Sequence, residues 1–84
     1  MYNVVYTMTS SAYVLLNAKL GNEETVLASL KEIPQVVEAH MVYGVYDVIA
    51  RVTAEDLAEL KNLISWKIRR IDHVRATLTM IIMD

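Results

Sequence analysis

The stretch VVEAHMVYGVYDVIARV, residues 36–52, decides the fold because it predicts two strands joined by a tight turn. Val36–Tyr43 and Tyr46–Thr53 are both rich in apolar β-branched and aromatic residues. Gly44-Val45 lies between them, and a hairpin turn commonly needs a glycine. The stretch therefore predicts a β-hairpin in the middle of the chain.

The segment before this hairpin reads as a strand followed by a helix. Ala12–Leu20 alternates with period two, as a half-buried strand does. Asn22 is a good N-cap for a helix that runs to about Ile33, and Pro34 ends that helix.

A second helix and a final strand follow the hairpin. Thr53 is the expected N-cap, with Asp56 as its capping-box partner. An apolar stripe then recurs at helical spacing: Leu57, Leu60, Ile64, Ile68 and Ile71. Val74–Met83 reads as the last strand. The order β-α-β-β-α-β predicts an α+β, ferredoxin-like domain over residues 12–84, with residues 1–11 as an N-terminal tail.

The strands are apolar on more than one face, which predicts a dimer. Two helices cover one face of a four-stranded sheet, and the other face of a monomer should be polar. Here a monomer would expose apolar sheet on the order of several hundred Å². A second copy is expected to pack on this face, as in a dimeric α/β barrel. The predicted contacts are Tyr13, Leu15, Ile49, Ile81 and Met83.

Composition narrows the class of protein. The 84 residues suffice for one domain with a modest core, so oligomerisation is a plausible source of stability. The net charge of −2 argues against a dedicated nucleic-acid binder. No transmembrane or signal segment is evident, so the expected protein is soluble and cytoplasmic, with no membrane partner.

Catalytic, metal and cofactor signals are weak. No nucleophilic set stands out, there is no cysteine, and His40 and His73 lack partners at metal-ligand spacing. We therefore predict no catalytic residue, no metal and no cofactor.

Trp66 reads as a core or interface anchor. A basic cluster has the composition of a phosphate site, but cations also favour a helix C-terminus and a solvated face. Its members are Lys67, Arg69, Arg70, His73 and Arg75.

The predicted turn carries the clearest binding chemistry. Tyr43, Tyr46 and Asp47 crowd around Gly44, and Asp47 begins an otherwise apolar strand. A carboxylate beside exposed backbone N–H groups suits a zwitterion, with the carboxylate on its ammonium and the N–H groups on its carboxylate. The alternative is a solvated turn in which local backbone satisfies Asp47.

The central hairpin resembles that of the Lrp/AsnC ligand-binding domain, also called the RAM domain. The family pattern V-x-E-A-x-x-V-x-G-x-Y-D matches residues 36–47. Ile33-Pro34-Gln35-Val36 resembles the family's exit from its first helix, and residues 75–80, RATLTM, resemble its last strand. The resemblance covers roughly residues 12–83.

This resemblance implies dimers that pair sheet against sheet and assemble further, often into octamers, with amino-acid effectors bound between dimers. It implies that Asp47 binds the ligand ammonium and that the turn backbone binds its carboxylate. Met41 would form a wall. The full implied site is Met41, Tyr43, Gly44, Tyr46, Asp47, Thr77 and Thr79.

Full-length regulators of this family also carry an N-terminal helix-turn-helix, whereas only about ten residues precede the domain here. We therefore expect a stand-alone RAM protein that does not bind DNA directly. It would sense amino acids by itself or modulate a full-length Lrp/AsnC regulator by co-assembly.

Two other readings remain open. A small dimeric α/β-barrel enzyme, such as a cofactor-free monooxygenase, would need polar residues inside a cavity between helices and sheet. Its available residues are Tyr13, Asn17, His40 and Trp66. An ACT-like regulatory domain would need a glycine-rich turn after the first strand, and residues 19–22 offer only Gly21.

Overall fold

The structure, a computed structural model, describes residues 9–84. Its elements are β1 Ser10–Ala18, α1 Glu23–Lys31, β2 Val36–Met41, β3 Val48–Ala54, α2 Leu57–Leu63, η1 Ile64–Ile68 and β4 Val74–Ile81. This is the predicted order β-α-β-β-α-β, so the α+β, ferredoxin-like fold is confirmed. β1 begins two residues before the predicted start, and most of the predicted tail, residues 1–8, lies outside the described part of the chain.

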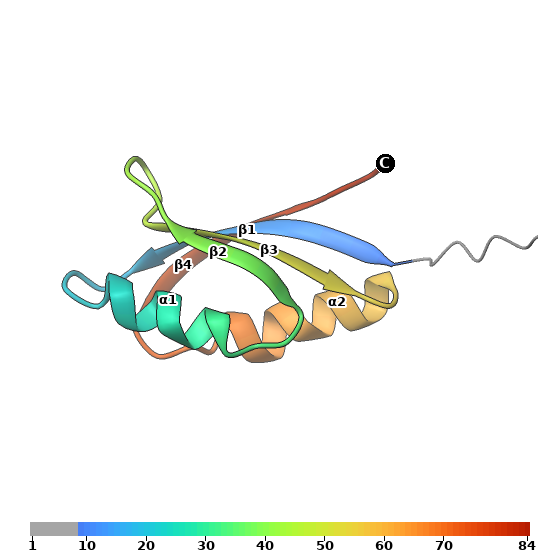
Figure 1. Cartoon of the computed structure of the whole chain (residues 1–84), viewed down its shortest axis with the longest axis horizontal. Coiled ribbons are helices and arrows are strands. Elements are labelled where there is room, and N and C mark those ends of the chain that lie inside the picture. The colour runs from blue at the N-terminus through green and yellow to red at the C-terminus, as the bar shows by residue number, and fades with distance from the viewer. Residues whose placement is uncertain (1–8) are drawn as a thin grey trace, which may run out of the picture.

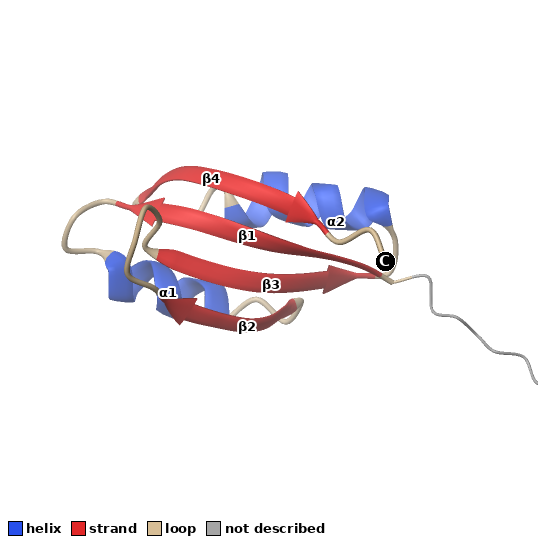
Figure 2. Ribbon diagram, turned by 90° about the horizontal axis from the view of Figure 1, so that it is seen from above, coloured by secondary structure: helices blue, strands red, loops and turns tan. Residues whose placement is uncertain are grey.

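The four strands form one antiparallel sheet in the order β2-β3-β1-β4. α1 and α2 cover the same face of this sheet, as Figures 1 and 2 show. We call the opposite side the open face. The connection between β2 and β3 rises from the open face at one end of the sheet (Figure 1).

The core lies between the sheet and the two helices. β1 is a central strand, and its alternation buries Ala12, Val14, Leu16 and Ala18 against the helical layer. The other buried side chains are all apolar: Val26, Leu30, Ala39, Val48, Ala50, Val52, Leu60, Leu63, Ile64 and Ile68. No polar side chain within residues 9–84 is buried with this core, so hydrophobic burial holds the layers together.

The hairpin connection is longer than predicted. β2 ends at Met41 and β3 begins at Val48, so residues 42–47 leave the sheet instead of Gly44-Val45 alone. The base of this connection is closed by a hydrogen bond from Val42 N–H to the Asp47 carbonyl at 2.9 Å. The predicted strands were too long because the apolar residues of this connection have high strand propensity.

The cap of the second helix differs from the prediction. Asp56 is the N-cap, and its carboxylate accepts a hydrogen bond from Glu59 N–H at 2.8 Å. Thr53 belongs to β3, and its hydroxyl donates to the Ser10 carbonyl at 3.2 Å. The predicted Thr53 cap is therefore wrong, because β1 and not the helix uses that hydroxyl.

The second helical region changes pitch midway. α2 ends at Leu63 and continues into the π-helical turn η1, in which Arg69 N–H donates to the Ile64 carbonyl at 2.9 Å. Such wide turns are rare and occur frequently at functional sites. Ile64 and Ile68 remain buried through this turn, so the apolar stripe predicts the buried face but not the pitch.

Candidate functional site

The β2–β3 connection holds most of the predicted site residues. Tyr43 and Val45 are almost fully exposed, whereas Tyr46 and Asp47 are half-buried at its base. The prediction that the hairpin turn needs a glycine at position 44 is wrong. The glycine that has a positive φ is Gly21, and a Cβ built on Gly44 would meet no atom within 4 Å. Neither backbone conformation nor packing within this subunit requires a glycine there.

Asp47 extends the pairing between β1 and β3 beyond its last residue pair, Leu16 with Val48. Its N–H donates to the Leu16 carbonyl at 3.0 Å, and its Oδ2 accepts from Ala18 N–H at 2.9 Å. Oδ1 makes no hydrogen bond to any residue between 9 and 84. One oxygen of this carboxylate therefore anchors the turn, and the other is free to accept a donor.

The two predicted threonines lie on β4 and face the helices. Thr77 pairs with Leu16 and Thr79 with Val14, and both of these β1 residues are buried beneath the helices. A cavity of about 450 Å³ opens between these threonines and the helix formed by α2 and η1. Its lining residues are Lys61, Ile64, Ser65, Arg69, Thr77, Thr79 and Ile81. We call this space the β4 cavity.

A single subunit does not bring the turn and the threonines together. The turn rises from the open face (Figure 1), whereas Thr77 and Thr79 lie on the helix side of the same sheet. β1 also separates β3, which follows the turn, from β4. Met41 lies beside the turn at the end of β2 and is about half exposed.

Two rows of side chains cross the open face, and both are apolar toward β1 and β4 but polar at β2. One row runs from His40 through Ile49 and Leu15 to Leu78. The other runs from Glu38 through Arg51 and Tyr13 to Met80. Tyr13, Leu78 and Met80 are 37%, 44% and 49% exposed.

Two of the predicted contact residues do not lie in these rows. Ile81 pairs with Ala12 and packs against the core on the helix side, so its placement on the open face is wrong. A bulge causes the error, because Asn17 pairs with Ala76 whereas Ala18 pairs with Val74. Met83 lies beyond the end of β4 and is almost fully exposed.

The basic cluster is split between two sides of the second helical region. Arg69 lines the β4 cavity, and with Arg75 it lines a smaller adjoining cavity of about 330 Å³. Arg70 instead lies over the ring of Trp66, 4.5 Å from its centroid. Trp66 is 62% exposed in this subunit, so it is not a core anchor.

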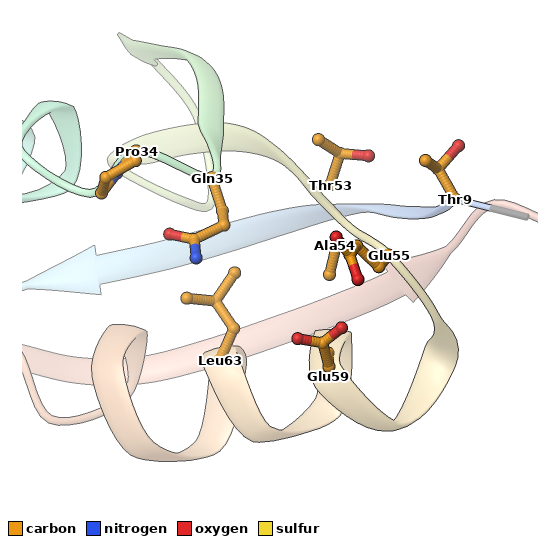
Figure 3. A pocket seen from close by; sticks show the side chains of 8 residues that line it. All are labelled: Thr9, Pro34, Gln35, Thr53, Ala54, Glu55, Glu59 and Leu63. Atoms are coloured by element: carbon orange, nitrogen blue, oxygen red, sulfur yellow. The ribbon is translucent and has the colours of Figure 1, made fainter. Parts of the chain in front are cut away.

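A further cavity was not indicated by any sequence motif. It measures about 430 Å³ and lies between the α1–β2 connection and α2 (Figure 3). Its lining residues are Thr9, Pro34, Gln35, Thr53, Ala54, Glu55, Glu59 and Leu63. They come from separate segments of the chain, and no single sequence motif joins them.

The residues named for an enzymatic alternative do not share a cavity. Tyr13, Asn17 and His40 lie on the open face, and Trp66 lies on the outside of the helical layer. His40 contacts the Glu38 carboxylate at 2.9 Å. Within residues 9–84 there is no cluster of three metal-ligating side chains, and no helix long and apolar enough to span a membrane.

Comparisons with known proteins show what this arrangement is similar to. Residues 11–84 match the family described as the Lrp/AsnC ligand binding domain. The regulatory protein AsnC of Haemophilus influenzae is 34% identical over 71 residues, which are 84% of this chain and 46% of that protein. The chain spans less than half the length of the curated relatives that it matches.

Solved structures share the fold. The crystal structure of FFRP-DM1 superimposes with a TM-score of 0.85 at 36% identity, covering 88% of this chain and 99% of that chain. The transcriptional regulator NMB0573 of Neisseria meningitidis, solved as a complex with L-Met, has a TM-score of 0.81. It is 11% identical over 100% of this chain and 59% of its own, so it is similar in fold alone.

Proposed function

This chain belongs to the Lrp/AsnC ligand-binding domain family, and we propose that it is a regulatory module that binds a free amino acid between its subunits. The predicted resemblance is confirmed. Because the curated relatives are transcriptional regulators, the prediction of a regulatory domain and not an enzyme is confirmed as well.

The observation that carries the proposal is that the β2–β3 turn rises from the open face, whereas Thr77 and Thr79 lie on the helix side of the same sheet. Asp47 offers a free carboxylate oxygen for a ligand ammonium. Thr77 and Thr79 offer hydroxyl donors for a ligand carboxylate, and we assign the carboxylate to them instead of to the turn backbone that the family resemblance implies. No residue of the turn lines the β4 cavity of the same subunit. We assign the turn of one subunit and the β4 cavity of another to the same ligand.

The two rows of the open face support assembly by sheet-to-sheet pairing. They present Leu15, Ile49, Leu78 and Met80 to solvent in one continuous patch that a second copy would cover. This pairing buries the open face and leaves the β4 cavity on the outer, helical side. The site between dimers would then form when such dimers associate further, with an octamer as the expected assembly.

The regulatory partner is a second part of the proposal. Residues 9–84 form an effector domain and contain no DNA-recognition helix. We assign DNA contact to full-length Lrp/AsnC regulators, with which this chain would co-assemble in the cytoplasm through the same surfaces. NMB0573, a regulator with the same fold, was solved in complex with L-Met. This supports the proposal that the ligand is an amino acid.

Native mass spectrometry with and without a mixture of the twenty amino acids tests the proposal. We expect even-numbered assemblies that retain one amino-acid mass per subunit, and this mass identifies the ligand. A monomer, or a dimer that retains no amino acid from the mixture, would contradict it.

A further inference from the structure

The β4 cavity is lined by cations on the helix side. Lys61, Ser65 and Arg69 are spaced four residues apart, and η1 is wide enough to keep all three on the side that faces β4. No aspartate or glutamate lines this cavity or the adjoining one, to which Arg75 contributes.

These cations have no anionic partner in the described part of the subunit. The ion pair found there, between Glu38 and His40, lies elsewhere, on the open face. Lys61, Arg69 and Arg75 therefore gather around adjoining cavities with no carboxylate to offset their mutual repulsion. An arrangement of this kind suits an anion that supplies the missing negative charge.

A neutral amino acid would use only part of this charge. The proposed function assigns its one carboxylate to the hydroxyls of Thr77 and Thr79, which leaves the side chains of Lys61 and Arg69 without an anion. A second carboxylate on the ligand would reach them, because a guanidinium binds a carboxylate through two parallel hydrogen bonds. At about 450 Å³, the cavity lies in the usual range for small-molecule sites, roughly 300–1,000 Å³.

We propose that the ligand of the β4 cavity is an acidic amino acid or a related dicarboxylate, selected by Lys61 and Arg69. This inference rests on the proposed function and names the chemical class of its effector. Thr77 and Thr79 bind one carboxylate, and Lys61 and Arg69 bind the other.

Isothermal titration calorimetry of the full chain with two isosteric pairs tests the inference. Glutamate is compared with glutamine, and aspartate with asparagine, since the members of each pair have nearly the same shape and the amide lacks the negative charge. We expect one acid to bind at least about tenfold more tightly than its amide, the difference typical of a charge-assisted contact. Arg69→Met and Lys61→Met should each reduce this ratio to about threefold or less.

Arg70→Met is the matched control. Arg70 is the next residue in sequence and is equally cationic, but it lies over Trp66 and does not line the β4 cavity. This variant should keep the full preference for the acid. Lys61 and Arg69 are exposed, so circular dichroism should report an unchanged fold for their variants.

The outcomes separate this inference from the proposed function. Equal or tighter binding of glutamine and asparagine would overturn the acidic ligand and leave an amino-acid sensor. Binding of succinate or glutarate without any amino acid would support the dicarboxylate site and overturn the amino-acid function. Binding of none of these ligands would overturn both, and equal losses for acid and amide in Arg69→Met would overturn its role in selection.

Discussion

The carboxylate of Asp47 accepts a hydrogen bond from the backbone N–H of Ala18 at 2.9 Å, just beyond the last residue pair of β1 and β3. The same residue donates its own N–H to the Leu16 carbonyl. Asp47 thus has a role in the fold that is separate from any ligand. Substitutions at this position must distinguish the two roles.

Asp47→Ala should lower the free energy of unfolding by about 1–2 kcal/mol, because it leaves a partly buried N–H without its acceptor. Urea denaturation measures this loss. Asp47→Asn keeps an acceptor oxygen and should recover most of the stability. Equal losses for the two variants would show that the Ala18 hydrogen bond is not the cause.

Asp47→Asn is therefore the variant that tests the ligand role. It removes the charge proposed to bind the ammonium while the turn stays anchored, so amino-acid affinity should fall at least about tenfold. Calorimetry at a protein concentration that maintains the assembly gives this value. Unchanged affinity would remove Asp47 from the site.

Leu78→Lys should convert the proposed dimer to monomers, because it places an unpaired charge beside Leu15 on the face that the dimer would bury. Sedimentation velocity reports the change. Leu57→Lys is the control, since Leu57 is 42% exposed, much like Leu78 at 44%, but lies on the helix side. A Leu78→Lys protein that still sediments as a dimer would contradict the sheet-to-sheet arrangement.

Thr79→Val should weaken amino-acid binding about tenfold, because it removes a hydroxyl from the β4 cavity while keeping a β-branched side chain of similar shape. Thr25→Val, at an exposed position on α1, should leave the affinity unchanged. Calorimetry compares the two variants. Similar affinities for both would place the carboxylate of the ligand away from β4.

Leu60→Ala should destabilise the protein by about 2–5 kcal/mol, because Leu60 is fully buried and its truncation leaves a cavity. Leu57→Ala, one helical turn earlier and 42% exposed, should cost far less. Both are measured by chemical denaturation at one fixed subunit concentration, since assembly shifts apparent stability. Comparable losses would contradict the assigned core.

The element order was predictable from the sequence because long periodic segments carry it. Leu60, Ile64 and Ile68 recur at helical spacing and are buried, and β1 alternates as a central strand does. Element ends were less predictable. Asp56, not Thr53, caps the second helix, because β1 supplies a hydrogen-bond partner for Thr53 that no local pattern reveals.

The facing of β4 could not be read from its sequence. Both sets of alternate residues in this strand contain apolar side chains, and a bulge near Arg75 shifts its register against β1. As a result, Ile81 faces the helices and not the open face. Leu78, which was not among the predicted contact residues, lies on the open face instead. The basic cluster predicted from the sequence contains Arg69 and Arg75 but not Lys61, and the sequence did not show which of its members face β4, since that depends on η1.

The proposed site takes Asp47 from one subunit and Thr77 from another, and this arrangement has a thermodynamic consequence. A ligand that must touch both residues acts as a cross-link between chains, so its binding and subunit association are linked equilibria. Each tenfold gain in association from the effector must be matched by an equal gain in effector affinity from association. Dilution of the protein would then weaken effector binding as effectively as a substitution in the site.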